Sequence, residues 1–164
     1  MESVNSVREY IILELSKIDV HNIVIIDWGC GSNRNKAARY IHQKDCEIIS
    51  VDIEPDRTPS LVADICKPLT IKEADLAFCL EVLEHCYDPD AVLDNIYNNL
   101  KKDGKLYISV PFVISPHGKA DYWRYTKLGI TTLLKKHKFK TIRVVRMEYA
   151  SRTRIGHFVE AIKL

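Results

Sequence analysis

Short apolar runs recur along the chain, and the first three carry an acid at or next to their carboxyl end. These three occupy residues 23–28, 47–52 and 61–64, and two more occupy residues 75–80 and 105–111. Runs of four to eight apolar and β-branched residues between turn-forming residues are typical of buried strands. The pattern therefore predicts five strands in one sheet.

A 3.6-residue apolar period appears first in residues 4–18. It predicts an amphipathic opening helix that covers a sheet edge or part of a pocket. Residues 35–42 predict a shorter helix that returns the chain to the sheet, so that the strands on either side of it are parallel. Residues 54–60 contain two prolines and suit a loop. The usual second crossover helix is therefore expected to be missing.

The helical period returns in residues 88–100. Asp88 suits an N-cap there, and Pro89 stands at the first helical position, where its missing N–H costs nothing. Gly104 is expected to end this helix. Residues 126–137 predict a further helix that begins with a hydroxyl cap.

Two β-rich stretches finish the sequence, at residues 140–149 and 155–162. No helix separates them, so they are most easily paired antiparallel. Together these elements predict an α/β fold with a Rossmann-like open sheet, mainly parallel, and a reduced set of crossover helices.

Length, composition and charge limit the class of protein. With 164 residues, 46% of them hydrophobic, the chain is expected to form one domain over residues 1–164. The 24 basic and 22 acidic residues give a net charge of +2, which disfavours a nucleic-acid partner. There is no basic-then-apolar leader and no apolar run near the ~20 residues that cross a bilayer. A cytoplasmic protein without a membrane partner is the expectation.

The five cysteines are scattered and odd in number, with no Cys-x-x-Cys pair. We expect reduced, mostly buried thiols rather than zinc ligands, and no metal site is predicted. The cysteines are Cys30, Cys46, Cys66, Cys79 and Cys86.

A glycine pair follows the first apolar run. Gly29 and Gly31 can turn the backbone with a positive φ, and they have no Cβ that would keep a ligand away. Asp52 lies 21 positions beyond Gly31, which is the spacing of the carboxylate that binds ribose hydroxyls in a βαβ unit. A nucleoside cofactor is therefore expected at this turn.

The identity of that cofactor follows from a missing residue. A dinucleotide fingerprint needs a third glycine three positions after the second, where this chain has Arg34. A nicotinamide-dependent oxidoreductase is therefore disfavoured. A cofactor without phosphate does not need bare backbone at the helix start. S-adenosylmethionine is such a cofactor, and Asp27 suits its cationic methionine end.

Six motifs, in order, resemble the class I S-adenosylmethionine-dependent methyltransferases, especially the small-molecule, type 11-like group. The motifs are Asp27-Trp28-Gly29-Cys30-Gly31, Val51-Asp52, Ala63-Asp64, Glu81-Val82-Leu83-Glu84-His85 with Asp88-Pro89, Leu100-Lys101-Lys102-Asp103-Gly104-Lys105, and Asp121-Tyr122-Trp123-Arg124-Tyr125-Thr126. The resemblance runs from about residue 23 to the end. It implies a seven-stranded sheet in the order 3-2-1-4-5-7-6, with strand 7 antiparallel.

The resemblance also implies how S-adenosylmethionine, and its product S-adenosylhomocysteine, would be bound. The glycine turn would hold the methionine portion, the acids after the second and third strands would bind the ribose and adenine, and the residues after the fourth strand would line the site. The implied contacts are Asp27, Gly29, Cys30, Gly31, Asp52, Ile53, Asp64, Ile65, Leu80 and Glu81. Asn33 departs from the pattern, since many relatives have a third glycine there.

Methyl transfer depends mainly on alignment of the acceptor, and a general base matters only for a hydroxyl or a protonated amine. Two histidines, His117 and His85, are the candidates for that base. The alternative is that His85 only caps the next helix and that His117 is an exposed loop residue.

The predicted function is methyl transfer from S-adenosylmethionine, by direct displacement, to an unidentified small-molecule or loop-accessible acceptor. Residues 80–83 lack the Asp/Asn-Pro-Pro-aromatic tetrad of enzymes that methylate base amines, which disfavours that class. The alternative is a non-catalytic methyltransferase-like binding or scaffold subunit. A homodimer is left open.

Overall fold

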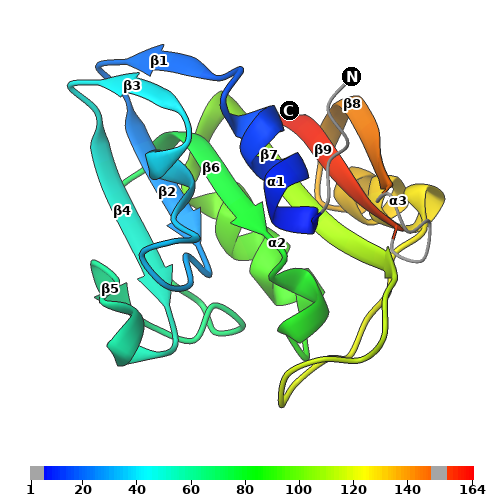
Figure 1. The fold of residues 1–164 in the computed structure, drawn as a ribbon. Helices are drawn as coiled ribbons and strands as arrows, with labels where there is room; N and C mark the ends of the chain where they lie inside the picture. Colours follow the sequence, from blue (N-terminus) through cyan, green and yellow to red (C-terminus); the bar gives the residue numbers. More distant parts are fainter. Residues whose placement is uncertain (1–5, 149–154) are drawn as a thin grey trace.

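The apolar runs become the central strands of a seven-stranded sheet in the computed structural model, which describes residues 6–148 and 155–164 (Figure 1). The strands of this sheet are β2 (Val24–Trp28), β4 (Glu47–Asp52), β5 (Leu61–Val62), β6 (Ala74–Leu80), β7 (Leu100–Val113), β8 (Phe139–Glu148) and β9 (Ile155–Lys163).

The strand order across the sheet is β5-β4-β2-β6-β7-β9-β8. The pairs from β5 to β7 are parallel, whereas β9 is antiparallel to both β7 and β8. Counted along the chain, this is the expected order 3-2-1-4-5-7-6 with strand 7 antiparallel. The Rossmann-like sheet and the terminal hairpin are therefore confirmed, although Tyr149 lies outside the described residues.

A second, two-stranded parallel sheet was not predicted. It pairs β1 (Asp19–His21) with β3 (His42–Lys44). The prediction of a helix over residues 35–42 was wrong, since only one 3₁₀ turn, η1 (Ala37–Arg39), forms there. The amide of Ala37 donates to the Asp27 carboxylate and ties this turn to β2, and the chain then extends to pair with β1 instead of continuing as a helix.

Three helices of nine or ten residues pack on the sheet. They are α1 (Val7–Leu15), α2 (Pro89–Asn98) and α3 (Lys127–Lys136). The caps expected for the last two are confirmed, because Asp88 accepts from Ala91 N and Thr126 accepts from Gly129 N. In the described part of the chain, no helix has the length and hydropathy needed to cross a membrane.

Gly104 does not end α2 as expected. That helix stops at Asn98, and Gly104 lies inside β7. A Cβ on Gly104 would lie 2.1 Å from Leu100 Cδ2 and 2.8 Å from Lys101 O. These contacts within the strand leave room only for glycine. The loop expected at residues 54–60 is confirmed, with a single 3₁₀ turn, η2 (Pro55–Arg57), inside it.

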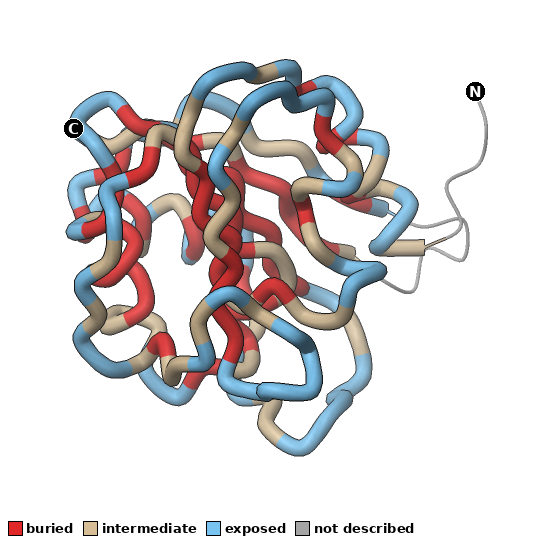
Figure 2. The backbone as a smooth tube through the Cα atoms, turned by 90° about the vertical axis from the view of Figure 1, so that its left-hand side faces the viewer, coloured by how far each residue is buried: buried red, intermediate tan, exposed pale blue. Residues whose placement is uncertain are grey.

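The two faces of the sheet carry separate apolar clusters. Ile11 and Leu15 of α1 pack with Phe78 on one face, whereas Ile96 of α2 and Ile130 of α3 belong to the cluster on the other. Figure 2 shows the buried segments crossing the middle of the molecule, with exposed loops at the ends of the strands. The helices thus form a layer on each side of a buried sheet, and the loops at the strand ends remain available for binding.

Asparagine side chains, rather than a crossover helix, hold the connection between β5 and β6. Asn95 of α2 accepts from Leu69 N and donates to the carbonyls of Ile65 and Lys67. Asn99 accepts from Ile71 N and donates to Leu69 O. Both asparagines are buried, so these bonds satisfy backbone groups that have little contact with water.

We expect Asn95→Ala to lower the free energy of unfolding by about 3 kcal/mol. The substitution removes three hydrogen bonds and leaves buried backbone groups without a partner. Urea unfolding followed by circular dichroism measures the change. Asn98→Ala is the matched control, since Asn98 is exposed on the same helix, and it should change stability by less than about 0.5 kcal/mol. Equal effects of the two substitutions would contradict the structural role of Asn95.

Candidate active site

The glycine turn after β2 is fixed by the neighbouring strand. Gly29 and Gly31 have φ values of 66° and 61°. The amides of Gly29 and Cys30 both donate to Val51 O of β4, at 2.8 and 3.0 Å. A Cβ on Gly29 would lie 2.6 Å from Val82 Cγ2. The first glycine is therefore required by both its backbone conformation and its close contact with the segment after β6.

A cavity of about 340 Å³ opens beside this turn, at the carboxyl edge of the parallel strands. The turn forms one wall, α1 covers another, and the residues after β6 and β7 close the far end. Seven of the residues predicted for the site line it: Asp27, Gly29, Cys30, Gly31, Leu80, Glu81 and His117. Open α/β sheets bind ligands at this edge.

Asp27 is the buried acid at the turn end of the cavity. Its Oδ2 accepts from Ala37 N at 2.9 Å. Burial raises the pKa of Asp27 to about 7, against the opposing effects of the Ala37 amide and the Lys36 charge, and the Asp52 charge adds to the rise. Burial, with the charges of Asp27 and Asp52, raises the pKa of the Cys30 thiol to about 11. Cys30 is therefore a neutral thiol, not a nucleophile, at neutral pH.

Asp52 lies behind the turn and does not line the cavity. Its Oδ2 accepts from Gly31 N at 2.8 Å and its Oδ1 accepts from Glu54 N at 3.0 Å. Each carboxylate oxygen can accept two hydrogen bonds, so both retain acceptor capacity. The next residue, Ile53, is 60% exposed, which is unusual for a large apolar side chain at a strand end.

The acid after β5 also lies outside the cavity. Asp64 Oδ1 accepts from Cys66 N at 2.9 Å, and its Oδ2 lies 4.0 Å from Lys67 Nζ. Ile65 is buried, and its carbonyl accepts from Asn95. The four predicted adenosine contacts, Asp52, Ile53, Asp64 and Ile65, thus follow β4 and β5 and do not line the cavity.

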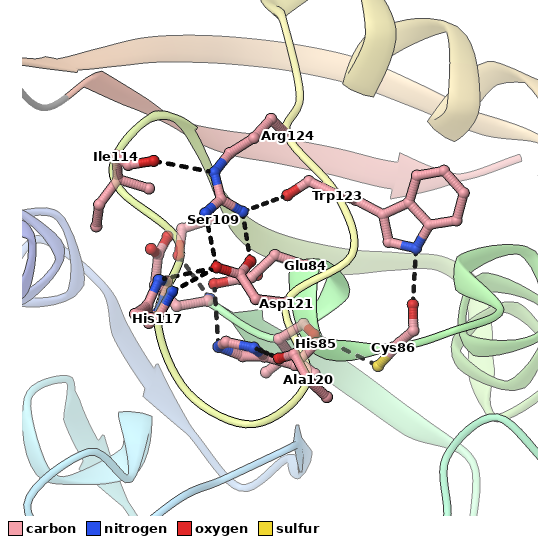
Figure 3. Close-up of polar contacts among 12 residues, drawn as sticks. Glu84, His85, Cys86, Ser109, Ile114, His117, Ala120, Asp121, Trp123 and Arg124 are labelled. Carbon is pink, nitrogen blue, oxygen red and sulfur yellow. Dashed lines mark hydrogen bonds and ion pairs between the residues drawn. The ribbon is translucent and has the colours of Figure 1, made fainter.

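Two carboxyl groups, the half-buried Glu81 and the buried Glu84, follow β6 at the far end of the site, and Figure 3 shows Glu84 there. Burial raises the pKa of Glu81 to about 7, although Ser109 and Arg124 oppose the rise. Burial, together with the charges of Glu81 and Asp121, raises the pKa of Glu84 to about 9. Glu81 also has a φ of 55°, a strained conformation that proteins retain mostly at functional sites.

The two histidines predicted as catalytic lie side by side, although 32 positions separate them in the sequence. Their rings meet edge to face, with centroids 5.0 Å apart. His117 lines the cavity, and its Nδ1 lies 3.3 Å from Asp121 Oδ2. His85 does not line the cavity, and its Nδ1 pairs with the Ala120 carbonyl.

The loop between β7 and α3 is anchored where it passes Glu84. The amides of Tyr122 and Trp123 donate to Glu84 O, and the indole of Trp123 donates to Cys86 O at 2.8 Å. Arg124 forms a two-pronged ion pair with Asp121. These bonds hold His117 against the end of the cavity, and they give Trp123 an anchoring role.

Comparisons with known proteins agree with this geometry. A family model described as a methyltransferase domain matches residues 6–143. No curated protein sequence matches the chain.

The chain belongs to the class I S-adenosylmethionine-dependent methyltransferases.

Solved structures share the fold at low identity. One is a Burkholderia thailandensis 1,6-didemethyltoxoflavin-N1-methyltransferase with bound 1,6-didemethyltoxoflavin and S-adenosylhomocysteine, which is 18% identical with a TM-score of 0.71 over 94% of this chain and 76% of that chain. Another is a Haloferax volcanii protein, assigned as a methyltransferase, in complex with the Trm112 methyltransferase activator, which is 13% identical with a TM-score of 0.78 over 94% and 89%. The [4+2]-cyclase SpnF is also 13% identical, with a TM-score of 0.72 over 94% and 79%. A cyclase shares the fold, so the fold alone does not identify the acceptor of this methyltransferase. The residues of its own site have to do so.

Several cavity residues of this methyltransferase were not predicted from the sequence. They come from α1 and from the loops after β2 and β7: Val7, Arg8, Ile11, Ile12, Leu15, Arg34, Asn35, Tyr40 and Ile114. The helical period of residues 4–18 does contain a signal, since Arg8, Ile11 and Leu15 fall on one face. Arg8 Nη2 donates to Arg34 O at 2.7 Å and so joins α1 to the glycine-turn loop.

We expect Gly29→Ala to destabilise this methyltransferase by more than Gly118→Ala does. Both glycines have a positive φ, but a Cβ on Gly118 has no atom nearer than 3.9 Å, whereas one on Gly29 would collide with Val82. Strain alone costs about 1–3 kcal/mol at such a position, and the collision adds to it. Urea unfolding of both variants measures the difference, and equal losses would show that the contact with Val82 is not restrictive.

Proposed function

We propose that this methyltransferase transfers a methyl group to a small-molecule or loop-accessible acceptor that enters at the His117 end of the cavity. The observation that carries the proposal is one cavity with the glycine turn at one end and Glu81 and His117 at the other. A cofactor held at the turn would direct its sulfonium toward the acceptor end. The small volume of the cavity favours a small or slender acceptor.

The residues at the turn fit S-adenosylmethionine. Gly29 and Gly31 line the cavity with backbone alone, and Asp27 supplies an acid for the cationic methionine end. Arg34 lines the same region and can pair with the methionine carboxylate. When bound, the cofactor supplies a methyl group on a sulfonium, which is a good leaving group.

We assign the adenosine half to the residues beyond the turn. Asp52 retains acceptor capacity for the two ribose hydroxyls, and the exposed side chain of Ile53 offers an apolar surface for adenine. Asp64 and Ile65 are proposed to bind the adenine edge, through a carboxylate oxygen and a backbone amide. The loop at residues 54–60 leaves this side without a crossover helix.

At the acceptor end, the chain's own groups position the nucleophile. Holding an acceptor in line with the methyl carbon can supply about 7–11 kcal/mol of the barrier through proximity and alignment. His117 lines this end and is the group best placed to contact the acceptor, while His85 packs behind it. Leu80 and Glu81, at the carboxyl end of β6, also line the cavity.

Binding and turnover together test this function. Isothermal titration calorimetry with S-adenosylmethionine and S-adenosylhomocysteine should show one site per chain. Incubation with labelled cofactor and a panel of hydroxyl, amine and carboxyl compounds, read by mass spectrometry, should show a gain of one methyl group in a small acceptor. Absence of cofactor binding would overturn the proposal, as would transfer only to a polymer too large for the cavity.

We expect Asp52→Asn to weaken S-adenosylhomocysteine binding about tenfold or more. The substitution removes the charge that accepts from the ribose hydroxyls, and a hydrogen bond to a charged group is worth about 1.5–3 kcal/mol. Asp56→Asn is the control, because Asp56 is an exposed acid in the following loop, and its affinity should be unchanged. Equal affinities of the two variants would show that the ribose lies elsewhere.

We expect S-adenosylmethionine to bind about tenfold more tightly at about pH 7.5 than at about pH 6. The pKa of Asp27 is about 7 and the ionised carboxylate favours a cation, so affinity rises as this group loses its proton. The upper limit stays below the pKa of an α-amino group, about 7.7–8.0, so most of the ligand keeps its ammonium charge.

The groups that face Asp27 are Lys36, Asp52 and Cys30, and Glu81 titrates in the same window across the cavity. Asp27→Asn should therefore reduce the pH dependence of the dissociation constant without removing all of it. A dependence identical to that of the wild type would exclude Asp27 from the binding of the methionine end.

A further inference from the structure

Among the described residues, Glu84 is the buried acid whose two carboxylate oxygens both lack a hydrogen-bond partner. Its side chain is 0% exposed. A buried carboxylate without partners is costly, and a missing ion is one physical explanation for it. The side chain lies beside the rings of His85 and His117, in the cluster of Figure 3.

We propose that Glu84, His85 and His117 bind a divalent transition-metal ion, such as Zn²⁺, at the acceptor end of the cavity. One ligand atom from each of the three residues can be chosen so that all lie within 4.8 Å of one another. Glu84 Oε1 lies 3.7 Å from His85 Nε2. Two imidazoles and one carboxylate are a ligand set that leaves a coordination position open for a substrate.

The distances need only a small adjustment. Ligand atoms bonded to Zn²⁺ at about 2.0–2.2 Å in tetrahedral geometry lie about 3.5 Å from one another. The widest separation in the cluster must therefore contract by about an ångström. The rotation of a histidine ring or of the Glu84 carboxylate is sufficient for this.

Groups around the three ligands have the arrangement expected of a second coordination sphere. His85 Nδ1 pairs with the Ala120 carbonyl, which favours a proton on Nδ1 and leaves Nε2 for the ion. His117 Nδ1 lies 3.3 Å from Asp121 Oδ2, and Asp121 is itself held by Arg124. Both rings are thus oriented by an acceptor, as the rings of metal-bound histidines usually are.

Charge also favours a cation. Glu84 is buried and Glu81 is half-buried here, and the nearby Arg124 already forms a two-pronged ion pair with Asp121. A divalent ion would compensate the charge of Glu84, which has little contact with water. Imidazole ligands favour transition metals over Mg²⁺, which prefers an all-oxygen set.

The role of the ion rests on the proposed function, whereas its binding does not. His117 lines the cavity, so an open coordination position would face an entering acceptor. An acceptor hydroxyl bound there would release its proton to solvent more easily, because the ion stabilises the oxyanion. The oxygen would then form a bond to the methyl carbon while the sulfur–carbon bond breaks, and that electron pair would stay on the sulfur.

Calorimetry on the full chain, first freed of metal with a chelator, tests the site directly. Titration with ZnCl₂ should show one site, bound at least tenfold more tightly than MgCl₂. No saturable Zn²⁺ binding, or Mg²⁺ binding of equal strength, would overturn the proposal. No cofactor is present in this titration, so the two proposals can fail separately. A chain that binds S-adenosylhomocysteine but not Zn²⁺ would overturn this inference alone. A chain that binds Zn²⁺ but not S-adenosylhomocysteine would overturn the proposed function alone.

Variants locate the ion. Glu84→Gln and His117→Gln should each weaken Zn²⁺ binding at least tenfold. His137→Gln is the matched control, because His137 lies 2.6 and 2.7 Å from Asp90 and Asp94 and is the competing histidine–carboxylate cluster. Thermal unfolding identifies any variant that fails to fold, and His85→Gln then replaces it. If His137→Gln loses Zn²⁺ binding while Glu84→Gln and His117→Gln keep it in full, the ion binds at the cluster of His137, Asp90 and Asp94. That result would overturn the assignment.

Discussion

The hydrogen bonds between the turn after β2 and the end of β4 are the constraint on which the site depends. Two turn amides share the carbonyl of Val51, and the amide of Gly31 donates to Asp52. Three residues in succession, Gly29 to Gly31, are thereby fixed at the carboxyl edge of two parallel strands. The position of Asp27, the course of the loop that follows and the inner wall of the cavity all follow from this attachment.

The two ends of the cavity differ in whether their buried carboxyl groups receive hydrogen bonds. At the turn, Asp27 is buried but receives a backbone hydrogen bond, so its carboxyl group is partly compensated. At the other end, Glu84 is buried without such compensation. A protein interior tolerates the second situation only with a proton or a cation at the carboxyl group. The Asp27 end therefore suits a singly charged group such as the ammonium of the cofactor, whereas the Glu84 end suits a proton or the proposed divalent ion.

The sequence was most informative where a signal is local. The strands of the seven-stranded sheet, the N-caps at Asp88 and Thr126, the glycine turn and the loop at residues 54–60 each depend on a few adjacent residues, and all were predicted. The segment at residues 35–42 was not, because the hydrogen bond between Ala37 and Asp27 and the pairing of β3 with β1 decide its structure. Nothing in the local sequence reports either contact.

The candidate site was predictable to the same extent. The glycine turn and Asp52 were predicted from their spacing, and the resemblance to methyltransferases implied the other cofactor contacts, among them Asp64 after β5; these contacts stay predictions. The contact between His85 and His117 could not be derived, since it depends on how the loop after β7 folds back on the segment after β6. The proposed metal ligands could not be predicted from sequence spacing for the same reason, because they come from two separate segments.

The anchoring of the loop between β7 and α3 limits how an acceptor can enter. Its second half is tied to Glu84 and Cys86 by three hydrogen bonds that involve Tyr122 and Trp123, so it cannot swing outward as a whole without breaking them. The arc before Asp121 is mostly exposed and carries His117, and it is held at Ile114, His117 and Ala120. Mutational drift confined to that arc could therefore change which acceptors are admitted while the cofactor edge of the sheet stays intact.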